Sequence, residues 1–316
     1  MVENYGLPYT GSKSRIAHWV IDNLPSGRVL IDAFAGGCAI THRALLSQKW
    51  QTVIANDING KYPQLFADAM HGQYRDEKRW ISREDFERLK EKNAFVACCW
   101  SFGNNVRNYM YSQAIEPYKR ALHYAIVFDD FAPMQELMPE VAQAVHDALQ
   151  GQNNLHDRRI TAQNVIVKTL KRLTDDNFAH PIIRHARLQS LERLERLQSL
   201  ESLERLQSLE RLEILERLQV TSLSYDEIDI PDGAVVYCDP PYHGCDKRLY
   251  EGTAKAFDHN AFYDWCVSVS KTNPIFISEY SIEDDRFEVV AEKQKMTSMS
   301  WKTAFNVTER LYTVKK

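Results

Sequence analysis

The sequence RVLIDAF at residues 28–34 is a short, mostly apolar run that ends at the glycine pair Gly36 and Gly37. The residues that follow, CAITHRALLSQ, space their apolar side chains as one face of a helix does. The same order returns, because residues 51–55 predict a second strand and residues 59–70 a second helix. Such alternation is typical of an α/β protein with a parallel sheet.

Strand patterns reappear near the carboxyl end of the chain. Four short apolar runs predict strands there, at residues 234–238, 274–278, 287–291 and 310–314. The sheet is therefore expected to combine both ends of the chain, with a long insertion between them. The predicted boundaries are residues 1–64 and 219–316 for the two parts of the sheet domain, 65–187 for the insertion and 188–218 for a leucine repeat.

The composition is that of an ordinary folded protein. Of its 316 residues, 44% are hydrophobic and 26% are charged, which excludes a wholly disordered or collagen-like chain. The formal net charge of −4 excludes a molecule drawn as a whole to nucleic acid, so any such site must be local. Residues 155–187 are a candidate, because they contain seven Lys and Arg against three acidic residues.

Membrane, secretory and metal sites are not indicated. No apolar run approaches the roughly 18 residues that a transmembrane helix needs, and the first residues lack the apolar segment of a secretory signal. We therefore expect a cytoplasmic protein with no membrane partner. The six cysteines form no C-x-x-C pair, so we expect reduced thiols and no metal.

A repeat follows the basic region. From residue 188 to residue 218 a leucine stands at every third position. In an α-helix a step of three residues turns by about 300°, so the leucines would wind around the axis. A 3₁₀ helix has three residues per turn and would align them in one stripe. Because Leu, Glu, Arg and Gln also favour α-helices, three alternatives stay open: a 3₁₀ helix, an α or broken helix, and a tolerated polar spacer.

The sequence DPPY at residues 239–242 directly follows the apolar run at 234–238. This places it at the carboxyl end of a buried strand, where open α/β sheets bind ligands. Two consecutive prolines donate no hydrogen bonds and stiffen the chain. Asp239 and the carbonyl of Pro240 are therefore expected to be fixed acceptors beside the ring of Tyr242. A planar exocyclic amine, which has two N–H bonds, is the matching substrate.

Three further motifs precede DPPY. The sequence DAFAGG at residues 32–37 is a glycine turn, where small residues allow backbone amides to approach a cofactor closely. Asp57 ends the second predicted strand, at the distance from the glycines where nucleotide sites place an acid against ribose hydroxyls. Near the amino terminus, Tyr9, Gly11 and Lys13 supply an aromatic ring, a flexible glycine and a cation before a predicted helix.

These four motifs, in this order, resemble the N6-adenine DNA methyltransferases of the Dam type. The resemblance covers residues 5–60 and 219–316, and the segment SFGNN at 101–105 is similar to a feature of the same family. It implies a Rossmann-like methyltransferase sheet with an inserted helical target-recognition domain. The leucine repeat departs from the best-known members, so a DNA recognition sequence is not carried over.

The resemblance also implies a cofactor and a reaction. The methyl group of S-adenosylmethionine would pass to N6 of an adenine flipped out of double-stranded DNA at a specific sequence, since that atom is inaccessible inside a duplex. Asp239, Pro240 and Tyr242 would be the catalytic residues. The implied cofactor contacts are Tyr9, Lys13, Asp32, Phe34, Ala35, Gly36, Asp57 and Asp239.

DNA contacts are expected in the insertion. Residues 161–173 predict an amphipathic helix that presents basic side chains to the phosphate backbone. The predicted DNA-binding residues are Asn104, Asn105, Arg107, Arg158, Arg159, Lys168, Lys171 and Arg172. For each of them a solvated surface position is the alternative. We expect a monomer or a weak dimer.

Two other functions stay open. The same acceptor geometry suits methylation of cytosine N4 or of adenine in RNA, although an Asp at position 239 favours DNA adenine by resemblance. The second alternative is a DNA-binding scaffold with a vestigial catalytic site, which the intact Lys13, Asp57 and DPPY residues disfavour.

Overall fold

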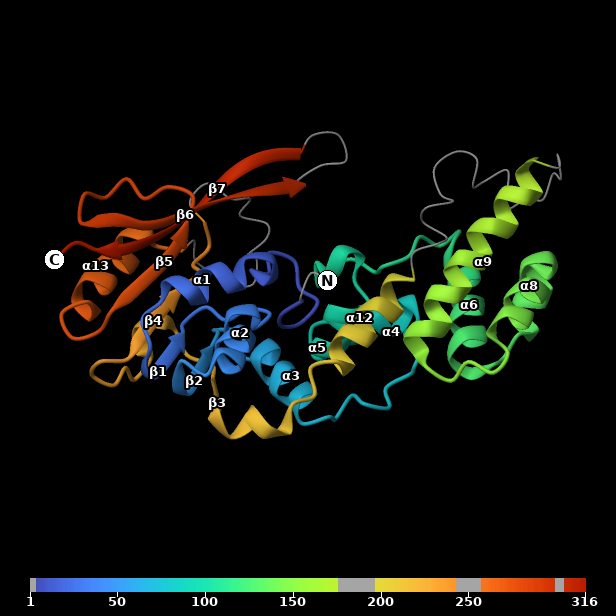
Figure 1. Ribbon diagram of the computed structural model, residues 1–316, viewed down its shortest axis with the longest axis horizontal. Helices are drawn as coiled ribbons and strands as arrows, with labels where there is room; N and C mark the ends of the chain where they lie inside the picture. Colours follow the sequence, from blue (N-terminus) through green and yellow to red (C-terminus); the bar gives the residue numbers. More distant parts are fainter. Residues whose placement is uncertain (1–3, 176–196, 243–256, 299–303) are drawn as a thin grey trace. The chain divides into compact units, whose positions relative to one another are not determined.

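The structure is a computed structural model that describes residues 4–175, 197–242, 257–298 and 304–316 (Figure 1). The chain divides into two compact units. The sheet unit contains the described parts of residues 1–7, 11–73 and 209–316, and the insertion unit contains residues 8–10 and the described parts of 74–208. The sheet unit thus draws on both ends of the chain.

A single sheet of seven strands, among the described residues, forms the centre of the sheet unit, in the order β3-β2-β1-β4-β5-β7-β6. Parallel pairing connects β3 through β5, and β7 lies antiparallel between β5 and β6. This Rossmann-like arrangement confirms the predicted α/β fold. The strands are β1 (Gly27–Asp32), β2 (Trp50–Asn56), β3 (Leu218–Thr221), β4 (Val235–Cys238), β5 (Ile275–Glu279), β6 (Phe287–Ser298) and β7 (Ala304–Val314).

Six of the seven strands coincide with predicted apolar runs. The exception is β3, whose sequence LQVT closes the leucine repeat and carries no strand pattern of its own. It forms because it pairs with β2 from Val53↔Leu218 to Asn56↔Thr221. The hairpin strands β6 and β7 are longer than predicted, since they pair with each other from Phe287↔Val314 to Ser298↔Ala304.

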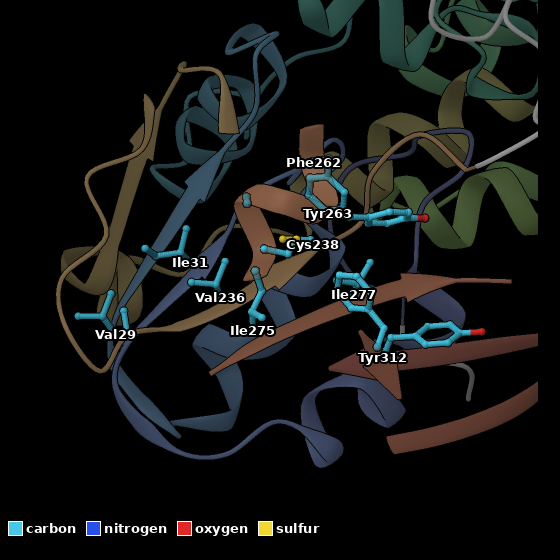
Figure 2. Close-up of a cluster of buried hydrophobic side chains, with 13 residues drawn as sticks. Val29, Ile31, Val236, Cys238, Phe262, Tyr263, Ile275, Ile277 and Tyr312 are labelled. Atoms are coloured by element: carbon cyan, nitrogen blue, oxygen red, sulfur yellow. The ribbon is translucent and has the colours of Figure 1, made fainter. Parts of the chain in front are cut away.

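The core of the sheet unit lies where the central strands meet α13. Alternate residues of β1, β4 and β5 are buried on this face, as the two-residue period of a strand requires. Figure 2 shows Ile31, Val236 and Ile275 on neighbouring strands, and Phe262 of α13 belongs to the same buried cluster. Complete burial of such a side chain contributes roughly 1.5–3 kcal/mol to folding. This packing fixes the strand ends that carry the site.

Helical segments surround the sheet. They are η1 (Ser14–Ile16), α1 (Ala17–Asn23), α2 (Ala39–Ser47), α3 (Lys61–Met70), η3 (Leu212–Arg217), η4 (Tyr225–Glu227) and α13 (His259–Val269). The predicted helices after the first two strands correspond to α2 and α3. Because α3 continues to Met70, the sheet unit extends to Gln73, past the predicted boundary at 64.

The insertion unit is helical. Its segments are α4 (Arg83–Leu89), α5 (Ala94–Cys99), η2 (Phe102–Asn104), α6 (Glu116–Phe128), α7 (Ala132–Leu137), α8 (Pro139–Leu149), α9 (Leu155–Asp175) and α12 (Gln198–Gln207). Proline occupies the first turn of α6, α7 and α8, where its missing N–H costs no helical bond. The predicted amphipathic helix at 161–173 lies within α9, which begins six residues earlier, at Leu155.

The leucine repeat is a broken helix in its described part, and residues 188–196 lie outside the described residues. Gln198–Gln207 form the α-helix α12, in which Leu200, Leu203 and Leu206 are buried. Leu212–Arg217 form the short 3₁₀ helix η3. A single 3₁₀ helix is therefore wrong for residues 198–207. Three leucines at steps of about 300° still share one α-helical face, whereas the leucines of a longer α-helix would wind around its axis.

Candidate active site

The carboxyl ends of β1, β4 and β5 lie side by side at one edge of the sheet. The register pairs Asp32 with Tyr237 of β4, and the backbone N–H of Ala33 donates to the Tyr237 carbonyl at 2.9 Å. All four residues of β4 are buried, and Asp239 follows the strand directly. The two prolines after it leave no N–H to continue the ladder. The DPPY sequence thus lies at the predicted sheet edge.

Lys13 binds this strand end. Its Nζ atom lies 2.8 Å from Oδ1 of Asp239 and 2.6 Å from the hydroxyl of Tyr242. The same ammonium lies 3.4 Å from Oε1 of Glu309 on β7. It also lies over the Tyr242 ring, 4.4 Å from the centroid. Lysine has three N–H donors, and these three oxygens match them in number. We call Lys13, Asp239, Tyr242 and Glu309 the lysine cluster.

Glu309 was missed by the sequence analysis. It is fully buried, at 0% exposure, and its Oε1 accepts a short hydrogen bond from the Tyr242 hydroxyl. One signal was available in the sequence, because Glu309 stands two residues before the buried Leu311 and so shares its face of β7. An acid at an inward-facing strand position is rare unless it is paired.

The charges and the burial of the lysine cluster shift the pKa values of Lys13 and Tyr242. Burial lowers the pKa of Lys13, but the carboxylates of Asp239 and Glu309 outweigh burial, so the pKa of Lys13 is raised above its ordinary value. Burial and the same two carboxylates raise the pKa of the Tyr242 hydroxyl well above its ordinary value. Lys13 is therefore charged and Tyr242 neutral at physiological pH, which leaves one cation beside two carboxylates.

The glycine turn and Asp57 meet at the end of β2. The backbone N–H of Gly36 donates to Oδ2 of Asp57 at 2.9 Å, and that of Asn59 donates to Oδ1 at 2.8 Å. Gly36 has a φ of 47°, a left-handed conformation that favours glycine. Burial raises the pKa of Asp57, although these two hydrogen bonds oppose the shift. Each carboxylate oxygen keeps a lone pair for a further donor.

Two of the predicted cofactor contacts, Asp32 and Phe34, have partners within the protein. Asp32 is 1% exposed and accepts hydrogen bonds from the backbone N–H and the hydroxyl of Thr41 on α2. Burial raises the pKa of Asp32 to about 7, while the Thr41 hydroxyl opposes the shift. The ring of Phe34 stacks on that of Tyr225 with centroids 5.7 Å apart. Both residues support the turn from within the core.

The other predicted cofactor contacts, Ala35 and Tyr9, and the predicted catalytic residue Pro240 have different surroundings. Ala35 joins the turn to β2, since its N–H donates to the Asn56 carbonyl at 2.8 Å. Tyr9 belongs to the insertion unit with Pro8 and Thr10. Pro240 is buried. The structure therefore brings together Lys13, Asp239 and Tyr242 from the predicted set, and separately joins Gly36 with Asp57.

In the insertion unit, side-chain hydrogen bonds hold the segment at 101–108, which contains η2. The Asn104 side-chain amide donates to the Cys98 carbonyl at 2.8 Å and to the Ser202 hydroxyl at 2.9 Å. Oδ1 of Asn105 accepts from the backbone N–H groups of Arg107 and Asn108. Both asparagine side chains thus hold the loop in shape, while the side chain of Arg107 is half-buried.

Arg158 and Arg159 lie inside the insertion unit, at 7% and 6% exposure. The Arg158 guanidinium donates to the carbonyls of Ala125, Ile126 and Gln152 and to the Asp129 carboxylate. Arg159 binds Glu204 of α12 with two nitrogens, at 2.6 and 3.0 Å. These bonds attach α9 to α6 and to α12.

Lys168 and Arg172 differ from the buried Arg158 and Arg159 in their exposure to solvent. Both side chains are exposed, and at a spacing of four residues they share one face of α9. Lys171 lies on the same helix, but its side chain is outside the described part of the structure. The exposed positive charge of α9 is therefore carried by Lys168 and Arg172 among the described side chains.

Among the described residues, no group of three or more His, Cys, Asp or Glu side chains is arranged to hold a metal ion. In the same part of the chain, no helix has both the length and the apolar character needed to cross a membrane.

A family model matches part of the chain. Residues 9–137 match the family described as D12 class N6 adenine-specific DNA methyltransferase. This segment contains Tyr9, Lys13, the glycine turn and Asp57, and it ends in α7; the DPPY sequence lies after it. No curated protein matches the chain. The match and the Rossmann-like sheet support an adenine-specific DNA methyltransferase enzyme.

Proposed function

We propose that the protein transfers the methyl group of S-adenosylmethionine to N6 of an adenine that is flipped out of double-stranded DNA at a specific sequence. The observation that carries this proposal is the lysine cluster at the carboxyl end of β4. There, the Lys13 ammonium lies 2.8 Å from Oδ1 of Asp239. The Asp239 carboxylate and the Pro240 carbonyl are the acceptors that a planar amine would need.

Hydrogen-bond acceptors make the adenine amine reactive. The N6 lone pair is delocalised into the ring, so the free amine is a poor nucleophile. When the Asp239 carboxylate and the Pro240 carbonyl accept its two N–H bonds, they favour the pyramidal geometry in which the lone pair points at an electrophile. Asp239 also stabilises the positive charge that develops on the amine. Lys13 and Glu309 keep Tyr242 fixed beside it, as the proposed stacking surface for the base.

The strand ends fit S-adenosylmethionine, which supplies an electrophilic methyl group when it is bound. Asp57 has one free lone pair on each carboxylate oxygen after binding Gly36 and Asn59, and two vicinal ribose hydroxyls supply two donors. The lysine cluster carries one cation and two carboxylates, an excess of negative charge that suits a sulfonium. We propose Asp57, Gly36 and Lys13 as residues that hold the cofactor.

Asp57→Ala is expected to weaken binding of S-adenosylmethionine by about tenfold to a hundredfold. The loss corresponds to hydrogen bonds with a charged acceptor, which contribute about 1.5–3 kcal/mol. Titration calorimetry of the folded variant measures this change. Affinity for duplex DNA without cofactor should stay the same. Wild-type cofactor affinity in the variant would contradict the assignment of Asp57.

DNA binding is assigned to the insertion, and there to exposed cations. We propose that Lys168 and Arg172, with Lys171 on the same helix, contact phosphates, while Asn104, Asn105 and Arg107 form a preorganised loop for base contacts. The exposure of Phe102 supports base contacts by this loop. Its large apolar side chain is 54% exposed, while other residues of the same segment are held in place by hydrogen bonds. Arg158 and Arg159 are proposed to support α9 from within.

Lys168→Ala combined with Arg172→Ala is expected to flatten the salt dependence of DNA binding. Each lost phosphate contact lowers the slope of log K against log salt by about 0.9, because fewer counterions are released. Fluorescence anisotropy at several salt concentrations gives the slope. Lys271→Ala with Lys316→Ala, two exposed positions of the sheet unit, produces the same change of net charge and should leave it unaltered. An equal slope in wild type and the α9 variant would refute the phosphate contacts.

The function itself is tested by methylation of plasmid DNA with the purified protein, followed by mapping of modified bases. We expect N6-methyladenine within one sequence context. Label in cytosine, or in RNA adenine but not in DNA, would favour the other amino-methyltransferase activities. Cofactor and DNA binding without any methyl transfer would favour a vestigial scaffold.

A further inference from the structure

The insertion unit contains a cavity of about 620 Å³ that the contacts proposed above do not use. Its lining residues lie between Trp80 and Leu137, in the segment that leads into α4, in the amino-terminal part of α6 with the residues before it, and in α7. All of them belong to the insertion unit, whereas the lysine cluster belongs to the sheet unit. Ligand pockets typically have volumes of about 300–1,000 Å³, so the cavity is a candidate for a second binding site.

Two aromatic rings, those of Trp80 and Tyr124, line the cavity. The Trp80 ring is held in place by its neighbours, because it stacks on Tyr111 with planes 6° apart and meets the rings of Trp100 and His123 edge to face. Both lining side chains are nevertheless only half-buried. A ring that is already fixed loses little conformational entropy on binding, so the wall suits a planar, aromatic group.

Two arginines line the same cavity, and they differ in their partners. The Arg83 guanidinium donates to the Tyr111 carbonyl, and its Nε lies 3.3 Å from Oε2 of Glu116. Arg120 is exposed, and among the described side chains no carboxylate pairs with it. Its guanidinium carbon lies 5.5 Å from the centre of the Tyr124 ring. The cavity therefore presents one uncompensated cation directly beside an aromatic ring.

We propose that this cavity binds one nucleotide of the DNA substrate that lies outside the base stack, in addition to the target adenine. The base contacts the rings of Trp80 and Tyr124, and the phosphate binds Arg120. Stacking on aromatic side chains accepts any base, because every base has a π-face, and a guanidinium matches the geometry of a phosphate. The inference rests on the proposed function, since it requires that the insertion binds DNA. A free mononucleotide has the same chemistry, so the test separates the two sources.

The test compares a fully paired duplex with the same duplex carrying one unpaired thymidine, a base that has no N6 amine. Fluorescence anisotropy without cofactor gives both affinities. We expect the wild type to bind the bulged duplex about tenfold more tightly, which is within the range for stacking of one base on an aromatic side chain. Tyr124→Ala and Arg120→Ala should each lose most of this preference, because they remove the ring and the cation, and should bind the paired duplex much as the wild type does.

Two control variants match these changes. Tyr118→Ala removes a half-buried tyrosine of α6 that does not line the cavity, and Lys92→Ala removes an exposed cation elsewhere in the insertion unit. Both should keep the preference for the bulged duplex. Titration calorimetry with S-adenosylmethionine shows that each variant is folded. A preference that survives in both Tyr124→Ala and Arg120→Ala would mean that another site takes the unpaired nucleotide, and would overturn the inference.

Thymidine monophosphate distinguishes the two sources of the nucleotide. We expect it to compete only weakly with the bulged duplex, because it lacks the phosphate contacts of the neighbouring DNA. If it binds the wild type but not Arg120→Ala, while the two duplexes bind equally, the cavity serves a free nucleotide and the assignment to DNA is wrong. Equal affinity for the two duplexes, with methyl transfer intact, would overturn this inference alone. Absence of both DNA binding and methyl transfer would overturn the proposed function as well.

Discussion

Asp239→Asn is expected to reduce methyl transfer by about 10³-fold or more while the protein stays folded. The substitution keeps the shape of the side chain but replaces one acceptor oxygen with an amide that donates. Lys13 binds Oδ1 at 2.8 Å, and an ammonium cannot accept, so it forces the asparagine oxygen toward itself. The amide N–H groups are then left to face the adenine amine, donor against donor. Loss of one preorganised polar group of this kind typically costs 10²–10³-fold in rate, and a repulsive contact adds to that.

The measurement is single-turnover transfer of labelled methyl groups to duplex DNA. Affinity for S-adenosylmethionine is expected to change far less than the rate. Asp232→Asn is a matched control, because Asp232 is an exposed acid that precedes β4 on the same segment, and it should keep wild-type turnover. Normal turnover by Asp239→Asn would contradict the proposed mechanism.

Lys13→Met is expected to be the most destabilising single change in the site. It leaves the carboxylates of Asp239 and Glu309 without their shared cation in a buried place, Glu309 at 0% exposure. Removal of one partner from a buried ion pair typically costs about 3–5 kcal/mol, which is a large part of the free energy of unfolding of a typical domain. Urea unfolding against the exposed control Lys271→Met measures the difference.

Two further results would support the electrostatic cause. Protonation of a carboxyl relieves the uncompensated charge, so the loss in Lys13→Met should shrink as the pH falls. Adding Glu309→Gln to Lys13→Met should restore part of the stability, because it removes one of the two negative charges that Lys13 balances in the wild type. Such non-additivity is expected only for coupled residues. If the double variant is no more stable than Lys13→Met, the two residues do not interact as the distances indicate.

Much of the sheet unit could be predicted from local sequence. The apolar runs before Gly36 and before Asp239 correspond to β1 and β4, because a strand buried on both faces needs a nearly continuous apolar sequence. The position of DPPY at a strand end followed from the same run. The composition of α9 likewise predicted a helix with exposed Lys168 and Arg172, since helical spacing is a local property.

Other features depended on pairing across the chain. β3 has no strand pattern and forms against β2. Arg158 and Arg159, which by charge alone resemble DNA contacts, are buried because carbonyls of α6 and the Glu204 carboxylate of α12 meet them. The leucine period does not reveal where the repeat changes from α-helix to 3₁₀ helix, since that depends on which leucines find a packing surface.

The sequence by itself determined the α/β class, the strand ends and the presence of Lys13, Asp57, Asp239 and Tyr242, because each follows from local periodicity, turn chemistry or a short motif. Only the tertiary structure decided that Glu309 joins Lys13 and Tyr242 and that Asp32 supports α2 through Thr41. The physical reason is that the energy of a buried charge depends on the groups around it, and the fold assembles those groups from distant parts of the chain.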